Sequence, residues 1–168
     1  MLRSMGKDKV PVTSAIRVLR QHRVDFTAHP YDYEPRGGTR HSAQCLGVDE
    51  HAVIKTLVMQ DDAGQPLVVL MHGDREVSTK ALARALGVKA IRPCDPAVAE
   101  RHSGYQVGGT SPFGTRKAMP TYMEASIEAL PRLWINGGKR GLLVSMAPAE
   151  LVRVLSPTPV EVAIDREH

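Results

Sequence analysis

Aromatic residues are scarce in this sequence: phenylalanine, tryptophan and tyrosine together account for 4% of its 168 positions. Proteins that bind single-stranded nucleic acid by stacking need several such rings on one surface. A nucleic-acid partner of this chain would therefore be held mainly by charge. The same scarcity leaves the hydrophobic core to aliphatic and methionine side chains.

Cysteine is also rare, and the two cysteines, Cys45 and Cys94, lie far apart. This spacing excludes both a dense disulfide framework and a Cys-x-x-Cys zinc site. The seven histidines include no His-x-x-x-His pair, which would be typical of a helical metal site. We therefore predict no metal and no cofactor, and we expect Cys45 to be a buried small apolar residue rather than a nucleophile.

Long apolar runs are absent, since none approaches the roughly 20 residues that a membrane-spanning helix needs. Residues 1–9 are basic but lack the apolar core of a signal peptide. The length of the chain suits one domain. We therefore predict a cytoplasmic protein with no membrane partner, consisting of a flexible basic tail (1–9) and a single domain (10–168).

Charge is modestly positive, at +4 with a pI near 9.3. This surplus favours a polyanionic partner without identifying it as a nucleic acid. Hydrophobic residues make up 42% and charged residues 24% of the chain, which is ordinary for a folded globular protein.

Short helices and short strands alternate along the chain without forming regular βαβ units, which predicts one mixed α/β domain. Ser78 and Asp95 stand where helix caps are expected, and Asp61-Asp62-Ala63-Gly64 is a hairpin turn sequence. Helices are predicted over residues 13–22, 42–46, 79–86, a short stretch from 95, and 148–155. Strands are predicted over residues 24–30, 53–59, 67–71 (buried on both faces), 133–136, 142–146 and 160–164.

A lysine interrupts an otherwise apolar predicted strand in the segment Ile54-Lys55-Thr56-Leu57. Such a lysine either extends its ammonium to water or faces a site. By alternation, Lys55 and Leu57 share one face of the strand while Thr56 lies on the other. The residue types alone leave both interpretations of Lys55 open.

A second segment, residues 108–114, reads Gly-Gly-Thr-Ser-Pro-Phe-Gly. Consecutive glycines let a main chain approach a ligand closely, and the N–H groups of such a loop can bind an oxyanion or a phosphate. The ending of a Walker phosphate loop is missing. No Gly-x-Ser-x-Gly pattern surrounds Ser111, which argues against a nucleophilic serine. The segment is either a tight loop or the main-chain wall of a site.

A third segment, residues 136–141, reads Asn-Gly-Gly-Lys-Arg-Gly. The Asn136-Gly137 pair predicts a hairpin turn between two strands. Lys139 and Arg140 would then be adjacent cations at the tip, able to hold phosphates. A turn alone and a turn that binds an anion explain the segment equally well.

Taken together, these segments resemble the YbaK/EbsC family, which is related to the editing domain inserted in many bacterial prolyl-tRNA synthetases. The resemblance runs from about Val10 along nearly the whole chain, and its strongest parts are residues 54–57, 103–114 and 137–142. Three motifs in the family's order are far more specific than one. The resemblance implies a mixed α/β single domain with a central, barrel-like β-sheet flanked by short helices.

The resemblance also implies a trans-editing hydrolase that deacylates mischarged tRNA, with Lys55 and Gly108 as catalytic residues. Lys55 matches a lysine thought to hold the tRNA 3′ end or to polarise the ester. Lys139 and Arg140 are expected to contact tRNA phosphates. The expected partners are mischarged tRNA and prolyl-tRNA synthetase. The expected substrate-binding residues are Tyr31, Thr56, Gly109, Thr110, Ser111, Pro112, Asn136, Gly137 and Gly138.

The expected chemistry requires no protein nucleophile, because an aminoacyl ester is already activated. Hydrolysis needs a trapped carbonyl, a stabilised oxyanion and an attacking group in line. In the cysteine-specific branch of the family, the substrate thiol is proposed to be the attacking group. Many members of that branch carry an acidic residue where this chain has Leu143, and leucine cannot orient a substrate amine. We expect Cys-tRNA(Pro) as substrate, with Ala-tRNA(Pro) as the alternative.

Two other classes of function stay open on the sequence. One is a non-catalytic module that binds tRNA or a synthetase with the same fold. The other is a binder of small anions that uses the same glycine loops. Lys55 and the intact glycine loop favour the enzyme, because a pure binder would not need a small polar pocket.

Overall fold

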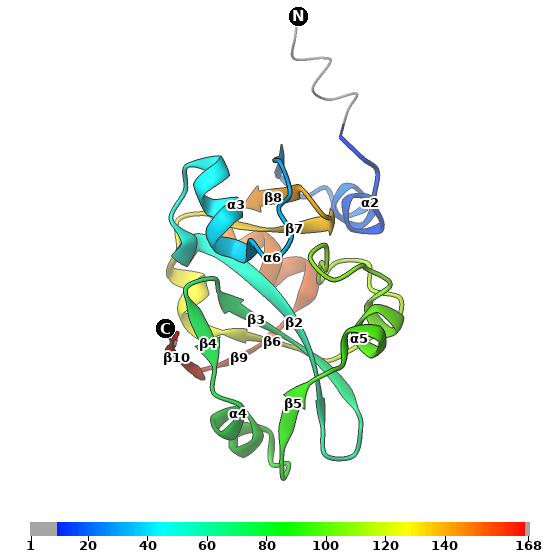
Figure 1. The fold of residues 1–168 in the computed structure, drawn as a ribbon, viewed down its shortest axis with the longest axis vertical. Helices are drawn as coiled ribbons and strands as arrows, with labels where there is room; N and C mark the ends of the chain where they lie inside the picture. The colour runs from blue at the N-terminus through cyan, green and yellow to red at the C-terminus, as the bar shows by residue number, and fades with distance from the viewer. Residues whose placement is uncertain (1–9, 167–168) are drawn as a thin grey trace, which may run out of the picture.

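A central strand with different partners at its two ends organises the structure, a computed structural model that describes residues 10–166 (Figure 1). The predicted tail, residues 1–9, lies outside the described residues. The strands are β1 (Thr27–Pro30), β2 (Val53–Asp61), β3 (Pro66–His72), β4 (Arg75–Val77), β5 (Ile91–Pro93), β6 (Thr121–Glu124), β7 (Leu133–Lys139), β8 (Leu142–Met146), β9 (Thr158–Val160) and β10 (Ala163–Asp165). The helices are α2 (Ser14–Gln21), α3 (Gly38–Leu46), α4 (Thr79–Leu86), α5 (Pro96–Ser103) and α6 (Pro148–Leu155), with 3-10 turns η1 (Glu50–Ala52) and η2 (Ala125–Ala129).

Eight of the strands form one mixed sheet in the order β1-β8-β7-β2-β3-β6-β9, with β5 paired to β2, while β4 and β10 form a separate ribbon. The pairs β2–β7, β3–β6 and β6–β9 are parallel. In Figure 1, β7, β8 and α2 lie at one end of the molecule, α4 and β5 lie at the other, and β2 runs between them. The predicted single mixed α/β domain is confirmed.

The strand β2 is paired along one edge and only partly along the other. β3 pairs with it from Ile54 to Gln60. On the opposite edge, β7 pairs with residues 53–54 and β5 with residues 59–61. Within the described part of the chain, residues 55–58 have no strand partner on this edge. The Val58 carbonyl in this gap accepts a hydrogen bond from the Cys94 N–H at 3.1 Å. Because alternate residues of a strand direct their N–H and C=O groups to a given edge, the main-chain groups of Thr56 are the ones left without a strand partner.

The hydrophobic core lies on both faces of the sheet. β3 is buried at every position, as its continuous apolar run predicts. On one face, Ile16 and Leu19 of α2 and Leu151 of α6 pack on the sheet. On the other face, Leu82 of α4 packs in a second cluster. None of the helices within residues 10–166 is long and apolar enough to cross a bilayer.

Several helix ends carry the capping residues that the sequence predicts. The hydroxyl of Ser78 accepts a hydrogen bond from the Ala81 N–H, and Gly87 ends α4 in the left-handed conformation. Gly47 ends α3 in the same way. Asp95 is an exception: it stands at the N-cap of α5, but its side chain makes no capping hydrogen bond. The predicted place of Asp95 at the start of α5 is confirmed, but the capping hydrogen bond is not formed.

The segment 136–141 differs from the predicted Asn-Gly hairpin turn. β7 continues to Lys139 through an irregularity between Asn136 and Lys139, and the chain reverses at Arg140 and Gly141. The Asn136 side chain causes the irregularity, because its Oδ1 accepts hydrogen bonds from the N–H groups of Gly138 at 2.7 Å and Lys139 at 3.2 Å. The side chain thus replaces the strand partner of these two groups.

The predicted last strand, residues 160–164, is in fact two strands that belong to different sheets. β9 pairs with β6, whereas β10 pairs with β4. The chain changes sheet between them because the buried Glu124 carboxylate accepts hydrogen bonds from the Val162 and Ala163 N–H groups at 2.8 and 3.0 Å. Sequence alternation cannot reveal this remote carboxylate.

Candidate active site

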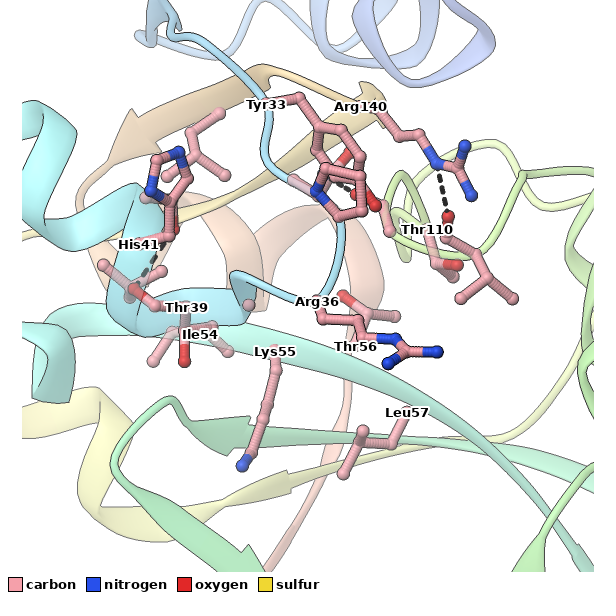
Figure 2. A pocket seen from close by; sticks show the side chains of 18 of the residues that line it. Tyr33, Arg36, Thr39, His41, Ile54, Lys55, Thr56, Leu57, Thr110 and Arg140 are labelled. Carbon is pink, nitrogen blue, oxygen red and sulfur yellow. Dashed lines mark hydrogen bonds between the residues drawn. The ribbon is translucent and has the colours of Figure 1, made fainter.

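A cavity of about 620 Å³ lies along the unpaired stretch of β2. The loop before α3 and the start of α3 form one wall, and the 107–110 loop and the β7–β8 turn form another. Figure 2 shows Tyr33, Thr110 and Arg140 on the far side of the cavity from the Lys55 ammonium.

The cavity contains several of the predicted site residues and leaves others outside. Those that line it are Tyr31, Lys55, Thr56, Gly108, Thr110, Asn136 and Arg140. Those that do not are Gly109, Ser111, Pro112, Gly137, Gly138 and Lys139. Lys55 and the start of the glycine loop thus share one cavity, whereas the second half of that loop lies behind its wall.

Lys55 is half-buried and extends, with Leu57, to one side of β2, as alternation predicts (Figure 2). Its Nζ lies 3.5 Å from the carbonyl oxygen of Gly73. Burial lowers the pKa of Lys55, and the positive charge of Arg166 acts in the same direction, while nearby carboxylates oppose both. An ammonium has three N–H donors, so two remain for a ligand.

Thr56 presents a polar atom that has no partner among the described residues. Its Oγ1 is buried without a hydrogen bond, and the residue lines the cavity. A buried hydroxyl left unsatisfied costs about 1–3 kcal/mol. A polar group of a bound ligand would remove this cost, which makes Thr56 a candidate contact.

Gly108 occupies a position that only glycine fits. Its φ is +89°, and a Cβ there would lie 2.6 Å from the Tyr33 hydroxyl. Two side chains of the β7–β8 turn hold the loop: Asn136 Nδ2 donates to the Gly108 carbonyl at 3.1 Å, and Arg140 Nε donates to the Val107 carbonyl at 2.8 Å. The loop is therefore fixed by its carbonyls, next to the cavity.

The second half of the glycine loop packs inside the protein. Ser111 is fully buried, and its Oγ accepts a hydrogen bond from the Phe113 N–H at 3.1 Å. The Tyr105 hydroxyl donates to the Phe113 carbonyl, and burial raises the Tyr105 pKa to about 12. Pro112 is buried beside them. These residues support the loop from behind, and Ser111 is not accessible as a nucleophile.

The glycines 109, 137 and 138 allow close contacts between segments. A Cβ on Gly109 would lie 2.8 Å from the Arg140 main-chain nitrogen, and one on Gly138 would lie 2.9 Å from the Tyr105 ring. The Gly137 carbonyl accepts a hydrogen bond from the Thr13 hydroxyl. In this structure, these glycines pack the loop, the turn and α2 together.

The two predicted phosphate contacts differ in what they already do. Arg140 donates to the Val107 carbonyl, and its guanidinium lies 5.2 Å from the centre of the Tyr33 ring. Lys139 is exposed. Contact of either residue with tRNA stays a prediction.

Sequence reasoning missed the residues of the loop before α3 and the start of that helix. Tyr33, Arg36, Thr39 and His41 all line the cavity. Arg36 has a φ of +64°, an uncommon conformation for a residue with a side chain. The loop has no periodic pattern, so only its glycines and proline were informative, and they indicate a loop without indicating a site.

The prediction that Cys45 is buried is wrong. The residue is exposed at the end of α3, and its Sγ lies 3.4 Å from His41 Nε2. The same His41 nitrogen lies 2.6 Å from the Asp32 carbonyl. Cys45 does not line the cavity. Within residues 10–166, no group of three His, Cys, Asp or Glu residues could hold a metal ion, and the absence of a metal stays a prediction.

One wall of the cavity is apolar. Leu143 of β8 is 4% exposed, lines the cavity and packs with Ala43 and Val53. Leu143 therefore offers no carboxylate to meet a substrate amine, whereas Glu34 lines the cavity elsewhere.

Comparison with known proteins identifies relatives of the chain. Residues 34–154 match the family "Aminoacyl-tRNA editing domain". The chain is 30% identical over 141 residues to a protein of Enterococcus faecalis named "Putative Cys-tRNA(Pro)/Cys-tRNA(Cys) deacylase EbsC", covering 83% of this chain and 86% of that one. It is also 30% identical over 95 residues to the proline–tRNA ligase of Nitratidesulfovibrio vulgaris, of which it covers 16%.

Solved structures share the fold at lower sequence identity. The crystal structure of hypothetical protein APE2540 has a TM-score of 0.83 at 20% identity, covering 90% of this chain and 99% of that one. The crystal structure of "a putative trans-editing enzyme for prolyl tRNA synthetase" has a TM-score of 0.78 at 21% identity, with coverage of 94% and 100%. The family match spans most of the domain and includes β2, the 107–110 loop and the β7–β8 turn. The chain belongs to the aminoacyl-tRNA editing domain family.

Proposed function

We propose that the chain is a trans-editing hydrolase that removes the amino acid from mischarged tRNA, with Cys-tRNA(Pro) as its first substrate and Ala-tRNA(Pro) as the alternative. Its family and the name of the Enterococcus faecalis relative support this proposal. The single observation that carries it is that Lys55, Thr56 and Gly108 line the same cavity.

The reaction breaks the ester between the amino acid and the terminal ribose. With alanine, water adds to the carbonyl carbon. With cysteine, the substrate thiol is the expected attacking group, and water then opens the resulting thiolactone. In both cases the bond to the ribose oxygen breaks, and that oxygen takes up the proton released by the attacking group. Negative charge develops on the carbonyl oxygen during the addition. The two free donors of the Lys55 ammonium stabilise this charge or a phosphate of the tRNA end, and a half-buried site strengthens the interaction.

Main-chain groups and one hydroxyl position the aminoacyl ribose. On the partly unpaired edge of β2, the main-chain N–H and C=O groups of Thr56 are left for the cavity, because the Val58 carbonyl already accepts a hydrogen bond from the Cys94 N–H. The buried Thr56 hydroxyl has no other described partner, and a rotation of its side chain would let it bind the substrate amine or a ribose hydroxyl. The Gly108 loop closes the opposite side at a place where a side chain would not fit.

The apolar wall at Leu143 influences which amino acid the cavity accepts. Beside Val53, it favours a thiol or a methyl group over a charged side chain. Cysteine and alanine both meet this requirement. Prolyl-tRNA synthetase, part of which this chain resembles, is the proposed protein partner, and the cytoplasm, where its tRNA substrate is charged, is the proposed location.

A deacylation panel tests the proposal. The substrates are Cys-, Ala- and Ser-tRNA(Pro) and Cys-tRNA(Cys), with wild type, Lys55→Ala and Lys80→Ala. Lys80 is an exposed lysine on α4 and does not line the cavity, which makes it the matched control. We expect Lys55→Ala to lose about a hundredfold in rate, because one oxyanion contact is worth that much, and Lys80→Ala to resemble wild type.

The outcomes distinguish the proposal from its competitors. Equally slow release of every amino acid by wild type and Lys55→Ala, together with tight binding of tRNA, would leave a non-catalytic binding module. Binding of inorganic phosphate that is unaffected by tRNA would instead support an anion binder.

A further inference from the structure

The Gly73 carbonyl lies where several charged elements meet. It accepts hydrogen bonds from Lys55 Nζ at 3.5 Å and Arg166 at 3.3 Å. Thr39 Oγ1 lies 3.2 Å from the same oxygen, but it lies only 2.7 Å from the Glu50 carboxylate. A hydroxyl has one proton, so the shorter contact with Glu50 takes it. The two cations therefore share the carbonyl.

Arg166 is held in place by two contacts with Glu50. Its two terminal nitrogens lie 2.7 and 3.1 Å from the two carboxylate oxygens. The Glu50 side chain is 15% exposed and that of Arg166 is 31% exposed. A two-point pair of this kind fixes direction as well as distance, and partial burial strengthens it. β10 pairs with β4 and delivers Arg166 to this position, near the labelled C-terminus in Figure 1.

The position behind Gly73 leaves little freedom. A Cβ at Gly73 would lie 2.7 Å from both Thr39 Oγ1 and the Val53 carbonyl. The preceding residue, His72, is 1% exposed, and its ring stacks on His51 with centroids 3.7 Å apart. Because these contacts limit the movement of Gly73, its carbonyl oxygen can hold the Lys55 ammonium in one position.

We propose that Arg166 is a positioning residue for Lys55: bound to Glu50, it holds the Gly73 carbonyl and so limits where the lysine ammonium can lie in the cavity. This inference rests on the proposed deacylase function. Arg166 lies outside the segment 34–154 that matches the family, so the assignment comes from contacts in this chain.

Four charged groups surround the Lys55 ammonium. Glu76, Glu50 and Asp74 favour its charged form, whereas Arg166 and burial disfavour it, and the net result is a lowered pKa. Removing the Arg166 charge while Glu50 stays ionised must therefore raise the pKa of Lys55. A loss of activity that came only from a less stable fold would leave this pKa unchanged, so the pKa reports whether the Arg166 charge acts on Lys55.

The experiment compares Arg166→Gln, Arg166→Lys and Arg75→Gln in the full chain. Arg75 makes an exposed ion pair with Asp165 on the same β4–β10 ribbon, at 2.6 Å, so it controls for loss of an arginine from this region. Two readouts are measured: kcat and KM for deacylation, and the rate of Lys55 acetylation by acetic anhydride as a function of pH, followed by mass spectrometry.

We expect Arg166→Gln to lower kcat about tenfold with little change in KM, and to shift the acetylation midpoint of Lys55 to higher pH. Arg166→Lys should restore the acetylation midpoint, because it keeps the charge, but should recover only part of kcat, because it loses the two-point contact with Glu50. Arg75→Gln should leave both unchanged.

An acetylation midpoint in Arg166→Gln equal to that of wild type would overturn the inference, as would equal losses of kcat in Arg166→Gln and Arg75→Gln. The acetylation profile needs no tRNA. If wild type hydrolysed no charged tRNA, the proposed function would fail, while a shifted midpoint would still establish that Arg166 acts on Lys55.

Discussion

At one end of the cavity the Lys55 ammonium lies among charged side chains, whereas at the other end the Gly108 loop presents a main chain held by Asn136 and Arg140. The Lys55 end depends on a balance between charges. Substitutions that keep the size of a side chain but change its charge should therefore alter the function of this end, and pH should affect it. The Gly108 end depends on shape. Substitutions that add atoms should therefore alter the function of this end, whereas pH should have little effect on it. An ester substrate needs both a charge for its oxyanion and a close-fitting wall for its acyl group.

The largest expected effect is at the wall. Gly108→Ala should reduce kcat/KM about a hundredfold, because the new Cβ would displace Tyr33 and the loop, and misplacement by about 1 Å has that cost. Steady-state deacylation measures it.

Gly64→Ala is the matched control for this change. Gly64 also has a positive φ, +82°, but has open space around it. Both variants should lose about 1 kcal/mol of unfolding free energy from backbone strain. Equal activity in the two variants would show that the clash with Tyr33 has no functional role.

The next largest expected effect distinguishes the role of Arg140 from that of the adjacent Lys139. Arg140→Gln should lower activity about tenfold at all salt concentrations, since it removes the hydrogen bond to the Val107 carbonyl and the contact with the Tyr33 ring. Lys139→Gln, which leaves these contacts intact, should weaken tRNA binding modestly and only at low salt.

Binding and rate measured between 50 and 300 mM salt distinguish the two variants. A salt-dependent loss in Arg140→Gln as large as that in Lys139→Gln would mean that Arg140 contacts phosphate rather than holding the loop.

The smallest effect is a pH dependence of stability at the charged end. Burial lowers the pKa of His72, so the unfolded chain binds a proton more readily than the folded one. The free energy of unfolding should therefore fall as pH drops below about 6.5, by at most about 1.4 kcal/mol per pH unit from this residue. His72→Gln should flatten the profile, whereas His22→Gln, at an exposed position, should not. Urea unfolding between pH 7.5 and 5 measures the effect, and parallel profiles for all three proteins would contradict it.

The difference between the two ends of the cavity also explains which features of the candidate site could be found from the sequence. The lysine in an apolar strand and the glycine loop are local features, and both were found without coordinates. Ser111 and Pro112 belong to the same glycine-rich segment as Gly108, yet they are buried behind the cavity wall. Sequence places neighbours in one loop but does not determine which side of the loop faces the cavity.

The sequence by itself determined the helices and the longer strands, the family and the segments that hold the candidate site, but it did not predict the short strands β4, β5 and β6. These properties depend on neighbouring residues and on the alternation of apolar positions, which are readable along a chain. Tertiary structure alone decided that Asn136 holds Gly108 and that Glu50 binds Arg166, 116 positions away. Such pairs form because distant elements pack side by side, and no local pattern specifies which side chains then meet.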